Sequence, residues 1–96
     1  MRYWYFLFEG RLNQPPQQKK LFASVLLPVA KEQDAVQALI ENLAQQNIEL
    51  VNIEDDFAFY EYQYDRDDPD NAVWFNWLAE VKKQNQAVFT PWQFFD

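Results

Sequence analysis

The chain contains no cysteine and no histidine, and Gly10 is the single glycine among its 96 residues. Without cysteine there is neither a disulfide nor a thiolate metal site, so stability must come from burial, as suits a reducing compartment. Without histidine there is no imidazole base and no ordinary set of zinc ligands. One glycine cannot build a backbone cradle for phosphate groups. We therefore expect a cytoplasmic protein without a cofactor or a metal centre.

Groups that could carry out catalysis are equally few. Ser24 and Thr90 are the only serine and threonine of the chain, and without a base partner each is expected to be structural. Glu61 and Asp65 form the carboxylate pair to consider for glycoside hydrolysis, but so small a domain has little material for a sugar cleft. We predict that the protein is not an enzyme.

The acidic run from Asp65 to Asp70 invites comparison with a calcium-binding EF-hand loop. Counted from Asp65, the fifth, sixth and twelfth positions hold Pro69, Asp70 and Asn76. The EF-hand loop requires Asp or Asn, then Gly, and finally Glu at these positions, so the pattern does not match. A solvated turn followed by a helix cap is expected, with an irregular Ca²⁺ or Mg²⁺ site as the alternative.

Basic residues are scarce, because eight Lys and Arg stand against fifteen Asp and Glu, for a net charge of −7. The excess is concentrated between Glu49 and Asp70, where nine acids face Arg66 alone, so the local charge is −8 and the rest sums to +1. Nucleic acids and anionic membranes attract proteins through Lys and Arg, so neither is an expected partner. A basic protein is the expected partner.

The same acidic segment is rich in aromatic side chains. In an extended strand Tyr60, Tyr62 and Tyr64 share one face, and their hydroxyl groups tolerate water. Carboxylates beside partly exposed rings are typical of a protein interface. The sequence therefore predicts a partner-binding surface formed by Asp55, Asp56, Tyr60, Glu61, Tyr62, Tyr64, Asp65 and Asp67.

The first third of the chain predicts two strands separated by a loop. Residues 10–20 contain Pro15 and Pro16 and few apolar side chains, so a mobile loop is expected there. A strand over residues 21–27 would stop at Pro28 and pair with the preceding strand as a hairpin. That preceding strand, residues 2–9, is apolar on both faces, with Trp4, Phe6 and Phe8 on one and Tyr3, Tyr5 and Leu7 on the other.

The middle of the chain predicts a helix and two strands. Residues 31–46 place apolar side chains at helical spacing, and Asn47 is a suitable left-handed terminator. Residues 48–53 and 57–64 each alternate like a strand. An acidic turn at residues 54–56 would join them as a hairpin, and one long strand is the alternative.

The last part predicts a helix and a strand. Asp68 followed by Pro69 is a helix cap and first-turn pair, so a second helix begins there and runs to about Gln84. A final strand covers residues 86–95, and Pro91 confines it to a sheet edge or a bulge.

Together these elements predict a single α+β domain over residues 1–96. The last six elements match the βαββαβ order of ferredoxin-like folds, with the aromatic strand added at the N-terminus. We expect a two-layer sandwich with both helices on one face of a mostly antiparallel sheet. The second face of the first strand would then be exposed and would favour a homodimer through Tyr3, Tyr5 and Leu7.

Two functions fit this sequence. The first is a small non-enzymatic protein that docks a basic protein through the acidic segment, as a toxin immunity protein or a nuclease inhibitor does. Its carboxylates would stand in for the phosphates of the target's substrate. The second is a self-associating structural or accessory domain, in which the acids serve only solubility. Salt distinguishes them, because it screens charge-steered binding and hardly affects a hydrophobic dimer.

Overall fold

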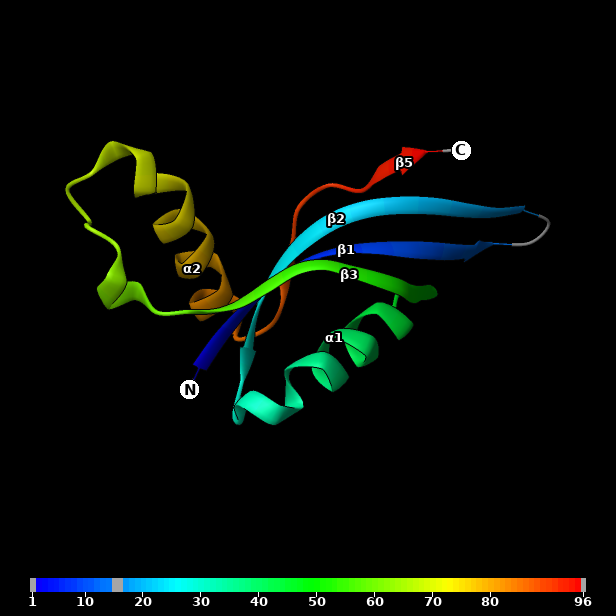
Figure 1. The fold of residues 1–96 in the computed structure, drawn as a ribbon, viewed down its shortest axis with the longest axis horizontal. Helices are drawn as coiled ribbons and strands as arrows, with labels where there is room; N and C mark the ends of the chain where they lie inside the picture. Colours follow the sequence, from blue (N-terminus) through cyan, green and yellow to red (C-terminus); the bar gives the residue numbers. More distant parts are fainter. Residues whose placement is uncertain (1, 15–16, 96) are drawn as a thin grey trace.

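One antiparallel sheet with two α-helices packed against it forms the fold (Figure 1). The computed structural model describes residues 2–14 and 17–95. The strand order is β3-β1-β2-β4, and β5 also pairs with β2. The predicted α+β class is thereby confirmed. The elements are β1 (Arg2–Gln14), β2 (Gln17–Val29), α1 (Ala35–Ala44), β3 (Ile48–Phe59), α2 (Ala72–Gln84), β4 (Val88–Phe89) and β5 (Gln93–Phe95), with short 3-10 turns at Glu32–Asp34, Glu61–Gln63 and Pro69–Asn71.

β1 lies inside the sheet and is apolar on both faces. One face carries Phe6 and Phe8, which are fully buried in a core that includes Leu39 of α1. The other face carries Tyr5, which packs in a second core with Leu78 of α2. We call these the α1 face and the α2 face of the sheet. Alternation along the strand assigns every β1 side chain to one face or the other.

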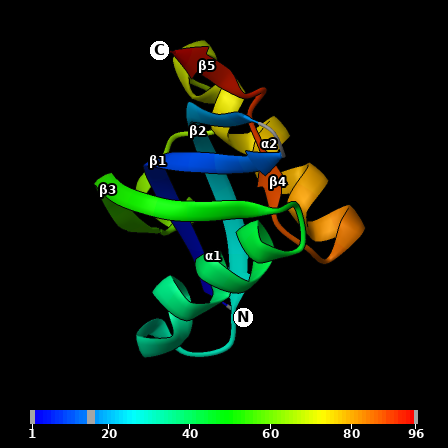
Figure 2. The ribbon, with the colours of Figure 1, turned by 90° about the vertical axis from the view of Figure 1, so that its right-hand side faces the viewer.

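The two helices therefore cover opposite faces of the sheet (Figure 2), and the prediction that both lie on one face is wrong. The reason is that β2 is also apolar on both sides, with Val25 and Leu27 on the α1 face and Leu26 on the α2 face. One helical layer can bury only one face of a sheet. Because α2 covers Tyr3 and Tyr5, the exposed patch from which a homodimer was inferred is not formed.

The segment predicted as a mobile loop, residues 10–20, is largely a continuation of the hairpin. Residues 10–14 belong to β1 and residues 17–20 to β2, while Pro15 and Pro16 lie outside the described residues. Glycine is needed at position 10 because β3 lies close to it: a Cβ on Gly10 would lie 2.8 Å from Cγ2 of Ile48 in β3. This polar end of the hairpin, residues 10–14 and 17–20, is stable as two strands because β3 pairs with the first and β5 with the second.

β3 is one strand of 12 residues, so the predicted hairpin over residues 48–64 is wrong and the single-strand alternative holds as far as Phe59. Two register shifts against β1 leave Val51 and Glu54 without a pairing partner, as in β-bulges. The shift at Val51 keeps Ile48 and Ile53 on the α1 face although their spacing is odd. The acidic stretch is tolerated within the strand because its side chains reach solvent.

Residues 60–71, which join β3 to α2, contain no strand, and this also changes the topology. Residues 61–63 form a 3-10 turn instead, so a single strand lies between α1 and α2 in chain order. The βαββαβ order that predicted a ferredoxin-like fold is therefore not formed, and the elements follow one another as ββαβαββ.

The first helix begins later than predicted. A 3-10 turn over Glu32–Asp34 precedes α1, and Asn47 adopts φ 60° just beyond its end, as expected for a left-handed terminator. Val36 and Ile40 are 45 % and 40 % exposed, so α1 buries a narrower stripe than its apolar spacing indicated. In the described ranges, 2–14 and 17–95, no helix is long and apolar enough to cross a membrane.

The second helix also begins later than predicted, because a 3-10 turn over Pro69–Asn71 precedes α2 at Ala72. The predicted cap is present at the start of that turn, where Oδ1 of Asp68 accepts a hydrogen bond from the backbone N–H of Asp70 at 3.0 Å and Pro69 follows. The helix ends at Gln84, and its C-cap Asn85 has φ 51°. Val73 is 70 % exposed, so it lies outside the buried side of this helix.

The single strand predicted over residues 86–95 is not formed, because the segment is divided into two short pieces, β4 and β5, with Pro91 between them. Both pieces pair with β2. Val88 packs on the α2 face, Trp92 packs on the α1 face and Phe94 is 51 % exposed.

Replacing Asp68 by Ala should lower the free energy of unfolding by about 1 kcal/mol, because the capping oxygen at the start of α2 is lost. The measurement is a urea titration followed by far-ultraviolet circular dichroism. The matched control is Asp67→Ala, which removes the same charge and leaves the cap intact. Equal midpoints for the two variants would contradict the assigned cap.

Candidate functional site

The predicted site residues fall into three groups along the chain. The first group, the edge acids, consists of Asp55 and Asp56 with their neighbour Glu54 on β3. The second, the tyrosine turn, contains Tyr60, Glu61 and Tyr62 around the 3-10 turn that follows β3. The third, the cap loop, contains Asp65 and Asp67 together with Asp68 and Asp70 ahead of α2. Tyr64 joins the core instead.

The edge acids are all exposed and point to different sides of the sheet. Asp55 pairs with Leu7 and lies on the α2 face, whereas Asp56 pairs with Phe6 and lies on the α1 face. Oδ2 of Asp56 accepts a hydrogen bond from Nε1 of Trp4 at 3.1 Å. Neighbouring carboxylates thus project from both sides of the sheet border.

The tyrosine turn departs from the strand geometry that the sequence predicted. After Phe59 the chain leaves the sheet, and the N–H of Gln63 donates to the carbonyl of Tyr60 at 3.1 Å. Tyr60 and Tyr62 remain neighbours, with ring centroids 5.5 Å apart, and Tyr62 is 80 % exposed. Tyr64 stacks on Phe59 at 4.8 Å, so the expectation that three tyrosines share one exposed face is wrong.

Glu61 is held by two basic side chains. Its carboxylate lies 2.8 Å from Nη2 of Arg66 and 3.2 Å from Nζ of Lys82. The guanidinium of Arg66 also covers the ring of Phe75 at 4.4 Å. These contacts attach the turn to α2, and they neutralise the charge of Glu61 within the protein.

A shallow pocket of about 190 Å³ adjoins the tyrosine turn. The ammonium group of Lys82 lies 5.9 Å from the centre of the Tyr3 ring beside it. The surface around the tyrosine turn therefore carries both basic and acidic side chains and is not purely acidic. The pocket is lined by Arg2, Tyr3, Phe59, Tyr60, Glu61 and Tyr62.

The cap loop uses its acids to order the backbone while leaving them in solvent. Oδ1 of Asp65 accepts from the N–H of Asp67 at 2.9 Å, and Oδ1 of Asp68 accepts from the N–H of Asp70 in the same way, at the start of the 3-10 turn before α2. The carbonyl of Asp65 accepts from Nδ2 of Asn71 at 3.0 Å. Turns of this type hold Asp side chains close together without cancelling their charge.

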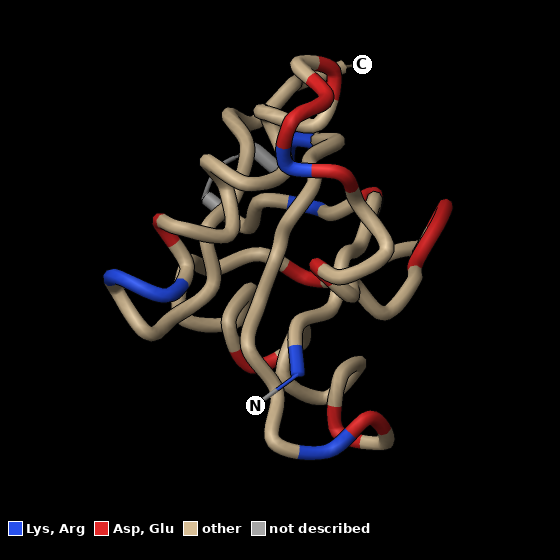
Figure 3. Tube along the Cα trace, turned by 90° about the vertical axis from the view of Figure 1, so that its left-hand side faces the viewer, with Lys and Arg blue, Asp and Glu red and all other residues tan. Residues whose placement is uncertain are grey.

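Acidic positions form several separate runs along the Cα trace (Figure 3), and most of those in segment 49–70 have no basic partner among the described residues. Among the described residues, two of the nine acids of segment 49–70 form ion pairs, Glu49 with Arg11 and Glu61 with its two bases. The other seven acids have no basic nitrogen within 4.0 Å in that part of the chain. The uncompensated charge therefore lies on the edge acids and the cap loop, and the tyrosine turn lies between them.

An aromatic cluster lies beneath this surface, between the sheet and α2. Trp74 of α2 lies at its centre, and Nε1 of Trp77 donates to the carbonyl of Val88 at 2.8 Å. Aromatic pairs at these separations stabilise a fold beyond their buried area. The centre of the Trp74 ring lies 5.3 to 6.0 Å from those of Tyr5, Phe57, Phe59, Tyr64 and Trp77.

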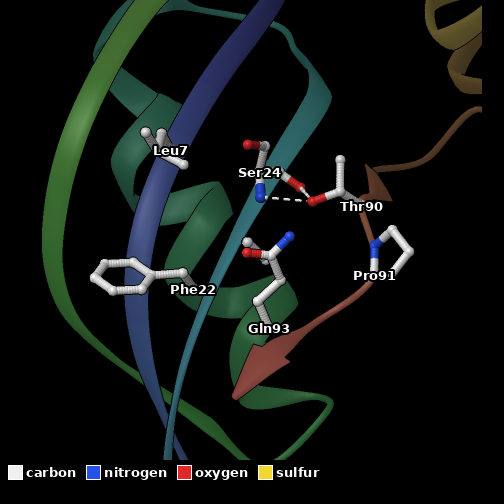
Figure 4. Close-up of a pocket in the computed structure, with 7 residues that line it drawn as sticks. Leu7, Phe22, Ser24, Thr90, Pro91 and Gln93 are labelled. Carbon is white, nitrogen blue, oxygen red and sulfur yellow. Dashed lines mark hydrogen bonds between the residues drawn. The ribbon is translucent and has the colours of Figure 1, made fainter. Parts of the chain in front are cut away.

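A second pocket, of about 290 Å³, lies on the α2 face of the sheet beside the segment that joins β4 to β5 (Figure 4). Here the N–H of Ser24 donates to Oγ1 of Thr90 at 2.8 Å, and the Ser24 hydroxyl lies 3.3 Å from that of Tyr5. Ser24 and Thr90 are 66 positions apart, so no local pattern indicates that they meet. The Thr90 hydroxyl accepts from the N–H of Ser24 and donates to its carbonyl, which fastens the segment after β4 to β2, while the Ser24 hydroxyl pairs with that of Tyr5 in β1. These contacts agree with the structural role expected for both residues. Leu7, Phe22, Ala23, Pro91 and Gln93 complete the lining.

Comparisons with protein-family models, with curated proteins and with solved structures find no match to this chain. A function must therefore be inferred from the chemistry of the surface.

Replacing Trp74 by Ala should lower the free energy of unfolding by about 3 kcal/mol, because the central ring of the aromatic cluster is removed. Chemical denaturation with guanidinium measures the change. The neighbouring variant Val73→Ala serves as the control, and its effect should stay within about 0.5 kcal/mol because Val73 is exposed. If the two variants lost the same stability, the central role of Trp74 would be disproved.

Proposed function

We propose that this protein binds a basic protein partner through its acidic surface and performs no catalysis. The observation that carries the proposal is the set of seven acids without a counter-charge among the described residues. Uncompensated charge gathered on one segment attracts an oppositely charged surface.

The surface supplies different contributions to such a complex. We assign long-range attraction to Asp55, Asp56 and Asp67, which are exposed. Tyr62 is assigned the part of an anchor, because an 80 % exposed ring beside a second tyrosine has apolar area to bury on binding. Glu61, Tyr64 and Asp65 hold the surface in shape through the contacts described above.

A toxin immunity protein or a nuclease inhibitor is the kind of protein that such a surface would suit. Enzymes that act on nucleic acids bind phosphates with Lys and Arg, and carboxylates in the right places compete for those groups. The proposed compartment is the cytoplasm, in keeping with a chain that has no cysteine. A self-associating domain is the alternative function, and it would need a surface other than Tyr3 and Tyr5.

With a partner captured from the native host, neutralising Asp55, Asp56 and Asp67 to Asn should lower the association rate about tenfold at low salt. The rate should also depend less on salt, because steering by these charges is lost. Stopped-flow or surface-plasmon kinetics at several salt concentrations measure both effects.

The matched control neutralises three acids elsewhere, Asp34→Asn, Glu41→Gln and Glu80→Gln, and should leave the association rate nearly unchanged. Tyr62→Ala should instead raise the dissociation rate and keep the salt dependence of association. If the two charge variants behaved alike, the acids of segment 49–70 would serve solubility alone. Light scattering on the same samples tests for self-association.

A further inference from the structure

Within residues 2–14 and 17–95, no strand pairs with the outer edge of β3. β3 is the last strand of the sheet order and pairs with β1 alone, whereas β4 and β5 pair along the far edge of β2. In Figure 2 the side of β3 away from β1 has no neighbouring strand within the described residues. A free edge presents alternate N–H and C=O groups that another strand can pair with.

Only one part of this edge is regular enough to accept a strand. The two bulges, at Val51 and Glu54, disturb the first half of β3. From Asp55 to Phe59 each residue pairs in unbroken register with β1. Within the described residues, no loop or side chain forms a hydrogen bond to the backbone of this stretch from outside the sheet. We call Asp55–Phe59 the open edge.

The open edge is held firmly from within. Phe57 and Phe59 pack against Trp74, with ring centres 5.7 and 5.3 Å from it. On the opposite face Asp56 accepts the hydrogen bond from Trp4. An ordered edge loses little conformational entropy when it binds, so it suits recognition better than a loose segment does.

Charge decides what kind of strand the open edge would accept. Glu54, Asp55 and Asp56 are exposed at its beginning and have no basic nitrogen within 4.0 Å among the described residues. If two copies of the chain paired in parallel along this edge, their acids would lie side by side and repel, and in an antiparallel pair Asp55 would lie opposite Phe59 with no opposite charge to meet. A strand carrying Lys or Arg would place opposite charges in the same positions.

We propose that the open edge of β3 binds an extended, Lys- or Arg-rich segment of the partner as an additional strand of the sheet. This inference rests on the proposed function, because it takes the partner to be a basic protein, and it states how that protein docks. Backbone hydrogen bonds supply affinity in this mode of recognition, and alternate side chains supply specificity. Basic side chains of the added strand meet Asp55 on the α2 face and Asp56 on the α1 face, and its far end reaches the tyrosine turn.

The test uses the full chain and a probe of defined composition, an eight-residue peptide with blocked ends in which pairs of lysines alternate with pairs of valines, so that each face of the extended peptide carries lysine. Its control has the same sequence with N-methyl groups on two consecutive central residues, which block hydrogen bonding at both edges of the peptide and keep its charge. Nuclear magnetic resonance titration at low salt measures affinity and the exchange of backbone amides. The unmodified peptide should bind about tenfold more tightly than the methylated one.

Two further results are expected. Amides at alternate positions of residues 55–59 should gain protection from exchange when the unmodified peptide binds. The variant Glu54→Gln, Asp55→Asn, Asp56→Asn should bind it more weakly, whereas the control variant Asp34→Asn, Glu41→Gln, Glu80→Gln should bind it as the natural chain does.

Three results would overturn the proposal. Equal affinity for the two peptides, with shifts confined to the cap loop, would mean that basic segments dock through charge alone, and the proposed function would stand. Failure of both peptides to bind would reject strand addition, and the kinetics of the captured partner would then judge the proposed function separately. Protection of residues 55–59 without peptide, together with a dimer in light scattering, would assign the edge to a second copy of the chain.

Discussion

The fold depends on burying β1 from both sides. Its side chains alternate between two apolar sets, and neither set can face water without a large cost in free energy. A layer on one side leaves the other exposed, so α1 covers Phe6 and Phe8 while α2 covers Tyr3 and Tyr5. In a small chain without disulfides, the aromatic area buried in this way replaces the core volume that a larger domain would have.

This constraint also determines where the acidic surface lies. Since β2 uses its second edge for β4 and β5, β3 is left as the open border of the sheet. Natural sheets commonly protect such borders with bulges and charged side chains, and β3 has both. The same acids that discourage pairing between copies of the chain attract a basic partner, so a protective feature and a binding feature coincide on Asp55 and Asp56.

Much of this arrangement could be predicted from local signals. Asp68 with Pro69 marked the capped turn that leads into α2, and Asn47 marked the end of α1. Each of these signals acts through backbone chemistry within a few residues of its own position. The two apolar faces of β1 were equally plain, although their assignment to helices on opposite sides was not.

The remaining features arise from contacts between distant residues. Residues 10–20 were predicted as a loop because the strand conformation of residues 10–14 and 17–20 depends on pairing with β3 and β5. The two bulges in β3 depend on its register against β1, which no local pattern records. Glu61 was expected to face a partner, but Lys82, 21 residues later, holds it within the chain. Tyr64 was likewise drawn into the core by Phe59 and Trp74.

β1 is buried on both faces, each by its own helix. Nuclear Overhauser effects on the isotope-labelled protein test this arrangement. The structure predicts cross-peaks from the Tyr5 ring to the indole protons of Trp74 and Trp77, whose ring centres lie 5.3 and 5.9 Å from it. It also predicts cross-peaks from the Phe6 ring to at least one methyl group of Ala35, Leu39 or Leu43, the α1 side chains of the opposite core. A Tyr5 ring without contacts to α2, or with contacts to Leu39, would contradict this arrangement.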